Sequence, residues 1–166
     1  MTTLVRRFAA WTVVFHWSHA LPYLVAATSA ARSLATKSEP ARTAHRLAGI
    51  AVVALPLLVL LAGDRRAILG DISLAIGGFG RRRAPPDSGY NLGQRLNTRV
   101  AIANWLLLAA TGLFVLRSPS ALGVRAAHAL FGAFSALLVL GHLGMAFLHP
   151  RTFRAITTGF LRRKEP

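Results

Sequence analysis

The segment AAHALFGAFSALLVLGHLGMAFL, residues 126–148, lies in the longest stretch of the chain without a charged residue, 126–150. It carries no Asp, Glu, Lys or Arg, and its polar side chains are two histidines and one serine. A helix that crosses a bilayer needs about 20 mainly apolar residues. The segment therefore predicts a membrane-spanning helix.

Three further apolar blocks have a similar length, at about 8–31, 44–62 and 100–116. Short connections, 32–43 and 117–125, separate the first two and the last two spans, and a long loop, 63–99, lies in the middle. Within this loop, the weakly apolar piece 68–79 predicts a short interfacial helix. Residues 1–166 are thus expected to form one all-α membrane domain, an up-down bundle of four transmembrane helices.

The basic residues predict the orientation of this bundle. Fourteen of the 20 Lys and Arg residues fall on the side of the two termini and the long loop, and six fall on the side of the two short connections. Cytoplasmic loops of membrane proteins carry the excess of Lys and Arg. Both termini are therefore expected in the cytoplasm, although four spans would also permit both termini outside.

The composition excludes several classes of function. The net charge of +15 arises from basic residues that flank apolar blocks instead of lining one polar face, so no nucleic-acid partner is expected. The chain contains no cysteine, which rules out disulfides, thiolate zinc sites, cysteine-ligated iron–sulfur clusters and the haem c attachment motif. A redox centre would need other ligands.

Histidines are the only ionisable residues that recur within the predicted spans, where such residues are costly and usually functional. The six are His16, His19, His45, His128, His142 and His149. By depth, His45 and His128 fall in an outer layer, and His16 and His142 fall in an inner, cytoplasmic layer.

The spacing of His128 and His142 on one helix is 14 residues. At 1.5 Å per residue this is about 21 Å, and 14 steps of about 100° return to nearly the same helix face. Two haems stacked across a membrane need this arrangement, and bis-histidine ligation suits electron transfer. Small residues four positions after each candidate ligand would leave room for a macrocycle; these are Ala20, Gly49, Gly132 and Ala146.

Other interpretations of the histidines remain open at this point. A histidine at a helix end, such as His45 or His128, can simply lie at the level of the lipid headgroups. We expect His19 to be a hydrogen-bonding partner of haem or quinone, and His149 to be a surface residue. Small residues can also serve close helix packing.

Several short motifs resemble a known family. His16–Trp17 with Ala20 resembles the first helix of the bacterial cytochrome b561-like superfamily, and the closer likeness is to the gamma subunit of membrane-bound formate dehydrogenase. The segments His45–Gly49, Tyr90–Arg95 and Thr111–Gly112 resemble motifs of that subunit. His128 and His142 match its two fourth-helix ligands in spacing.

The resemblance implies two haem b groups, one held by His16 and His142 on the cytoplasmic side and one held by His45 and His128 on the outer side. It also implies a quinone, menaquinone or ubiquinone, near Asn91, Gly93, Gln94 and His142. Amide side chains and backbone N–H groups can donate to a quinone carbonyl without carrying charge.

The sequence thus predicts a membrane-anchoring electron-transfer subunit of a respiratory oxidoreductase in the bacterial inner membrane. It would pass electrons between an iron–sulfur partner subunit and quinone, within a complex whose catalytic subunit is of the formate dehydrogenase or hydrogenase type. No catalytic residue is expected in this chain. The alternatives are a free-standing cytochrome b561-type quinol oxidase and a haem-free membrane anchor.

Overall fold

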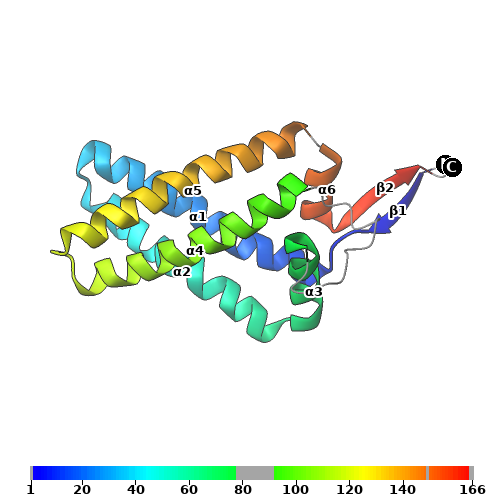
Figure 1. The fold of residues 1–166 in the computed structure, drawn as a ribbon, viewed down its shortest axis with the longest axis horizontal. Coiled ribbons are helices and arrows are strands. Elements are labelled where there is room, and N and C mark those ends of the chain that lie inside the picture. The colour runs from blue at the N-terminus through cyan, green and yellow to red at the C-terminus, as the bar shows by residue number, and fades with distance from the viewer. Residues whose placement is uncertain (1, 78–91, 149, 165–166) are drawn as a thin grey trace.

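A computed structural model describes residues 2–77, 92–148 and 150–164. Four long helices run along a common axis, and two short helices and a two-stranded sheet lie at one end (Figure 1). In chain order the elements are β1 (Thr2–Arg6), α1 (Ala10–Thr36), α2 (Glu39–Ala62), α3 (Arg65–Ile76), α4 (Leu92–Arg117), α5 (Leu122–Leu148), α6 (Pro150–Thr158) and β2 (Phe160–Lys164).

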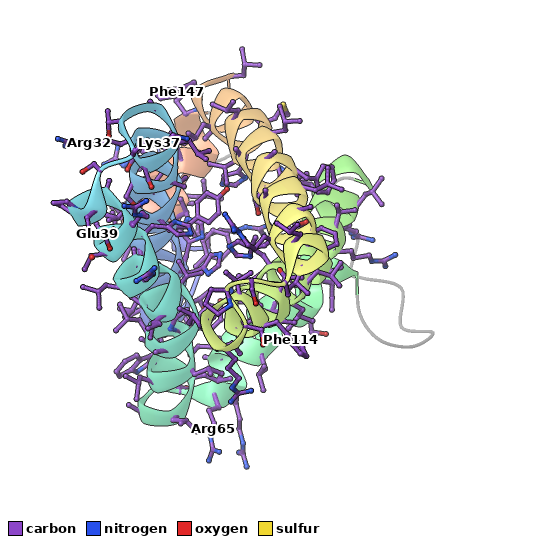
Figure 2. The ribbon with its side chains drawn as sticks, turned by 90° about the vertical axis from the view of Figure 1, so that its left-hand side faces the viewer. Arg32, Lys37, Glu39, Arg65, Phe114 and Phe147 are labelled. Atoms are coloured by element: carbon purple, nitrogen blue, oxygen red, sulfur yellow. The ribbon has the colours of Figure 1, made fainter. Side chains whose placement is uncertain are left out.

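The long helices form two antiparallel hairpins, α1–α2 and α4–α5. The turns that join them, 37–38 and 118–121, lie at one end of the bundle, which we call the loop end (Figure 1). The two strands, α3 and α6 lie at the opposite end, which we call the terminal end. Viewed from the loop end, one hairpin lies beside the other and side chains from both fill the space between them (Figure 2).

Three of the described helices, α2, α4 and α5, are long and apolar enough to cross a membrane. Large apolar side chains cover their outer surfaces, for example Leu58, Leu61 and Leu140, which are 58%, 71% and 64% exposed. Soluble monomers rarely expose such continuous apolar surface, so it is suited to contact with lipid. Helix α1 has the necessary length, 27 residues, but carries more polar side chains.

Each long helix extends beyond its predicted apolar block at one end or at both. The connections predicted at 32–43 and 117–125 shrink to turns at 37–38 and 118–121, and α4 begins within the predicted loop 63–99. Polar residues extend a helix wherever its end is capped, and the apolar block marks only the part suited to lipid. At the first turn, Lys37 adopts a left-handed φ of 55° and the Ser38 side chain accepts a hydrogen bond from the N–H of Ala41.

The fold is helical, as predicted, apart from a two-stranded sheet that was not predicted. β1 and β2 pair antiparallel, with Thr2 opposite Lys164 and Arg6 opposite Phe160. The pairing places both termini at the same end of the bundle (Figure 1). Five-residue strands at the two chain ends leave no hairpin signal in the sequence, because a turn does not join them.

Within each hairpin, small or polar side chains allow close helix contact. Tyr23, Ala26, Ala48 and Val52 form a buried cluster between α1 and α2. Between α4 and α5, the side chain of Asn104, which is 4% exposed, donates hydrogen bonds to the Ser135 hydroxyl at 2.7 Å and to a backbone carbonyl of α5 at 3.3 Å. Asn104 is a polar residue inside an apolar span, and its hydrogen bonds hold the two helices together.

Helix α3 packs across the terminal end and caps α1. The Asp71 carboxylate accepts hydrogen bonds from the N–H of Ala9 at 3.2 Å and from the Thr12 hydroxyl at 2.6 Å. Ala9 is the N-cap residue of α1 and has no capping side chain of its own. A carboxylate at a helix N-terminus also interacts favourably with the helix dipole. The interfacial helix predicted at 68–79 therefore lies at Arg65–Ile76 and anchors the start of α1.

We expect Asp71→Ala to lower the free energy of unfolding by about 1–2 kcal/mol, because the start of α1 loses its capping acceptor. Denaturant titration of the detergent-solubilised protein measures this change. Glu39→Ala is the control, because Glu39 forms an exposed ion pair with Arg42 at the loop end, and such pairs contribute about 0–1 kcal/mol. Equal effects of the two substitutions would show that Asp71 does not anchor α1.

Candidate functional site

Four of the predicted site histidines meet as two pairs inside the bundle. The imidazole rings of His16 on α1 and His142 on α5 have centroids 6.2 Å apart. Those of His45 on α2 and His128 on α5 have centroids 6.1 Å apart. We call His16 and His142 the terminal-end pair, and His45 and His128 the loop-end pair. Each pair joins a helix of one hairpin to α5 of the other.

The separation within each pair fits two axial ligands of one metal ion. A first-row transition metal bonds an imidazole nitrogen at about 2 Å, and that nitrogen lies about 1.1 Å from the ring centre, so two trans imidazoles have centroids roughly 6.3 Å apart. Both pairs have this separation to within a few tenths of an ångström. Among the described residues, no group of three or more His, Asp and Glu side chains converges on one point.

Both rings of the loop-end pair are oriented by hydrogen bonds at Nδ1. His45 Nδ1 lies 2.9 Å from the backbone carbonyl oxygen of Ala26, which can only accept. His128 Nδ1 lies 3.1 Å from the Thr111 hydroxyl oxygen. A hydrogen bond at one ring nitrogen fixes the tautomer and leaves the other nitrogen, Nε2, with the lone pair that a metal needs.

Gly112 lets the ring of His128 lie directly against α4. A Cβ atom at this position would lie 3.1 Å from His128 Cε1 and 3.6 Å from its Nδ1. The two glycines that were predicted to leave room for a macrocycle face more open space. A Cβ at Gly49 would meet no neighbouring atom within 4 Å, and one at Gly132 would meet only Leu108, at 3.9 Å. The residues beside the loop-end pair therefore fit a flat macrocycle.

The terminal-end pair has a different environment. His16 makes an edge-to-face contact with Trp17, with ring centroids 5.5 Å apart. The Trp17 indole donates a hydrogen bond to the carbonyl of Ile156 on α6 at 3.2 Å, so the start of α1 is held against α6. In the described part of the chain, neither ring of this pair has a hydrogen-bonding partner.

His19 lies between the two pairs and interacts with protein groups. Its Nδ1 lies 3.4 Å from the carbonyl oxygen of Val52. Its ring stacks on Tyr23 at 6.4 Å and meets Trp105 edge-to-face at 5.7 Å. The predicted role of His19 as a partner of haem or quinone stays a prediction.

Two of the predicted quinone residues, Gly93 and Gln94, lie in the first turn of α4 at the terminal end. Asn91 lies outside the described residues, as does His149. The contacts of Asn104 with Ser135 and of Thr111 with His128 set the antiparallel register of α4 and α5. In this register Gln94 lies opposite Met145, one helical turn from His142.

Sequence reasoning did not assign roles to Thr111, Asn104 and Trp105. Asn104 had a usable signal, because an amide inside an apolar span needs a partner on another helix. Thr111 had no such signal, because a threonine in a membrane helix ordinarily bonds a carbonyl of its own helix. Here the hydroxyl contacts both the Leu107 carbonyl of its own helix and His128 on α5.

Comparison with known proteins identifies the family. No curated protein and no solved structure matches the chain. The family model described as prokaryotic cytochrome b561 matches residues 7–159, which is nearly the whole chain. The chain therefore belongs to the prokaryotic cytochrome b561 family of membrane proteins, which bind haem b and transfer electrons.

Proposed function

We propose that this protein carries two haem b groups and passes electrons between a partner at the loop end and a quinone at the terminal end. The proposal rests on one observation: two histidine pairs lie at two levels of one helix bundle, and the ring centroids within them are 6.2 and 6.1 Å apart. When bound, the haems supply the one-electron chemistry, and the protein supplies ligation, orientation and electrostatics.

In this proposal all four long helices span the bacterial inner membrane, and α1 is the fourth span. Its polar residues are suited to the bundle interior, since His16 and His19 face partners on other helices. Helix α1 also packs along α2, one of the three apolar helices. The terminal end would lie in the cytoplasm, because 11 of the 17 basic residues that the structure describes lie there.

The ligand assignment follows from the pairs. His16 and His142 would hold the cytoplasmic haem, and His45 and His128 would hold the outer haem. With two histidines held on each iron, no open site for substrate would remain, which suits electron transfer. This supports a chain without catalytic residues of its own.

The quinone would bind at the start of α4, near Asn91, Gly93, Gln94 and His142. The register of α4 and α5 supports this place, because it brings Gln94 within one turn of the level of His142. Gln94 can donate to a quinone carbonyl from its side-chain amide, and Gly93 permits close approach to the backbone.

The partners in this proposal are an iron–sulfur subunit and a catalytic oxidoreductase subunit, as in a respiratory complex of the formate dehydrogenase or hydrogenase type. The chain would be their membrane anchor. One observation favours a second candidate, a free-standing cytochrome b561-type quinol oxidase: the loop-end turns span only residues 37–38 and 118–121, which offers a partner little surface. The two candidates differ in whether an iron–sulfur subunit co-purifies from native membranes.

The purified protein, expressed with an adequate haem supply, is expected to contain two b-type haems per chain. A dithionite-reduced minus oxidised spectrum, with haem extracted and quantified against protein, measures this. One haem per chain would leave one of the histidine pairs without its proposed role. A colourless protein would exclude electron transfer and favour a haem-free membrane anchor.

Single histidine substitutions are expected to remove one haem each. His128→Ala should lose the loop-end haem and His16→Ala the terminal-end haem, because a haem with one axial imidazole is held less firmly. Haem content and the reduced spectrum of each variant measure the loss. His19→Ala is the matched control on α1 and should keep two haems; loss of a haem there but not in His16→Ala would overturn the α1 assignment.

Gln94→Leu is expected to slow the oxidation of the reduced protein by added quinone at least tenfold, because a buried carbonyl acceptor loses its donor. Stopped-flow absorbance at the haem bands measures the rate, and the haem content should stay at the parent level. Thr157→Val is the control, since this exposed hydroxyl at the same end bonds only carbonyls of its own helix. An unchanged rate in Gln94→Leu would move the quinone site away from α4.

A further inference from the structure

The two histidine pairs differ in the hydrogen-bond acceptors near their Nδ1 atoms. In the loop-end pair, each Nδ1 has an acceptor, the Ala26 carbonyl for His45 and the Thr111 hydroxyl for His128. In the terminal-end pair, neither His16 nor His142 has one among the described residues.

The Thr111 hydroxyl acts as an acceptor toward His128. A hydroxyl has one proton to donate and two lone pairs. Thr111 lies 2.7 Å from the carbonyl oxygen of Leu107, one turn earlier in α4, and a carbonyl can only accept. Thr111 also lies 3.2 Å from the carbonyl oxygen of Leu108. We therefore assign the hydroxyl proton to these carbonyls and a lone pair to the Nδ1–H of His128, 3.1 Å away. This arrangement leaves His128 Nε2 as the metal-binding nitrogen.

An acceptor on Nδ1–H makes an imidazole a stronger electron donor to a metal, because it draws the proton away from the ring. A more basic axial ligand stabilises ferric over ferrous iron and lowers the reduction potential, and hydrogen bonding around the ligands is one of the means by which proteins tune haems. The loop-end pair has two such acceptors, and the terminal-end pair has none among residues 2–77, 92–148 and 150–164.

The distribution of charge acts in the same direction. Of the 17 basic residues that the structure describes, 11 lie at the terminal end and six at the loop end. The two acidic residues described at the terminal end, Asp64 and Asp71, accept hydrogen bonds at the starts of α3 and α1. A positive environment favours the form of a haem that has gained an electron, so it raises the potential at the terminal end.

We propose that Thr111 is a positioning residue that holds His128 through its Nδ1–H and, together with the Ala26 carbonyl behind His45, makes the loop-end haem the lower-potential one. This inference rests on the proposed function. With this order of potentials, transfer of one electron from a haem held by His45 and His128 to one held by His16 and His142 would be downhill. An iron–sulfur partner would supply each electron, and a quinone would take up two electrons and two protons to become the quinol.

The first test measures the order of the two potentials in the parent protein. A spectroelectrochemical titration resolves two transitions, and His128→Ala and His16→Ala, which each keep one haem, assign them to the loop end and the terminal end. The expected result is a lower midpoint for the haem that His16→Ala retains. A higher or equal midpoint for that haem would overturn the inference.

The second test removes the acceptor. Thr111→Val keeps the shape of the side chain, and we expect it to raise the loop-end midpoint by a threefold to tenfold change in the reduction equilibrium, about 28–59 mV for one electron. The terminal-end midpoint should stay unchanged. Thr111→Ser restores the hydroxyl and should return the loop-end midpoint to the parent value.

Thr28→Val is the matched control, because the Thr28 hydroxyl is exposed and bonds only carbonyls of its own helix. It should shift neither midpoint. Loss of the loop-end haem in Thr111→Val but not in Thr111→Ser would support the positioning role of the hydroxyl. Unchanged midpoints in Thr111→Val with both haems bound would contradict it.

The outcomes separate this inference from the proposed function. If the parent protein binds no haem or one haem, the proposal of two haem sites fails before potentials can be compared. If it binds two haems and their midpoints do not follow the hydrogen bonds, the two-haem function stands and only the role of Thr111 fails.

Discussion

The hydrogen bond from Asn104 to Ser135 is the constraint on which the arrangement of the site depends. It is 2.7 Å long and buried, and it joins α4 to α5 in the middle of two apolar helices. No water competes for these groups inside a bilayer, so a shift of one helix along the other would leave the amide without a partner. Ser135 lies seven residues from His128 and seven from His142. One interhelical contact thus fixes the height of both α5 histidines relative to the rest of the bundle.

The other hairpin needs a separate anchor, because its histidines lie on two different helices. At the loop end, the short turn 37–38 and the contact of His45 with the Ala26 carbonyl tie α2 to α1. At the terminal end, Asp71 caps α1 and Trp17 joins it to α6. The small helices at the terminal end therefore hold α1 at a defined height, and with it His16.

Much of this architecture could be predicted from the sequence, because a bilayer imposes length and polarity on every element that crosses it. The apolar blocks located the long helices, and the 14-residue spacing of His128 and His142 followed from helix geometry. The ends of helices were less predictable, since caps such as Asp71 act on α1 from 62 residues away along the chain. The pairing of β1 with β2 was missed for the same reason. Neither contact leaves a local pattern, because its partners meet only after the helices have packed.

The same argument explains why Thr111 could be noticed as part of a motif but not given a role. A threonine in a membrane helix satisfies its own hydroxyl by bonding a carbonyl one turn earlier, and Thr111 does so. Only the packing of α4 against α5 brings His128 to the remaining lone pair, and only Gly112, which has no Cβ, lets the ring approach so closely. Two adjacent residues thus contact one imidazole in different ways: Gly112 leaves room for the ring, and the Thr111 hydroxyl lies within hydrogen-bonding distance of its Nδ1. In a bundle whose hairpins contact one another less than the helices within each hairpin do, a cofactor held between such rings would also join the two hairpins.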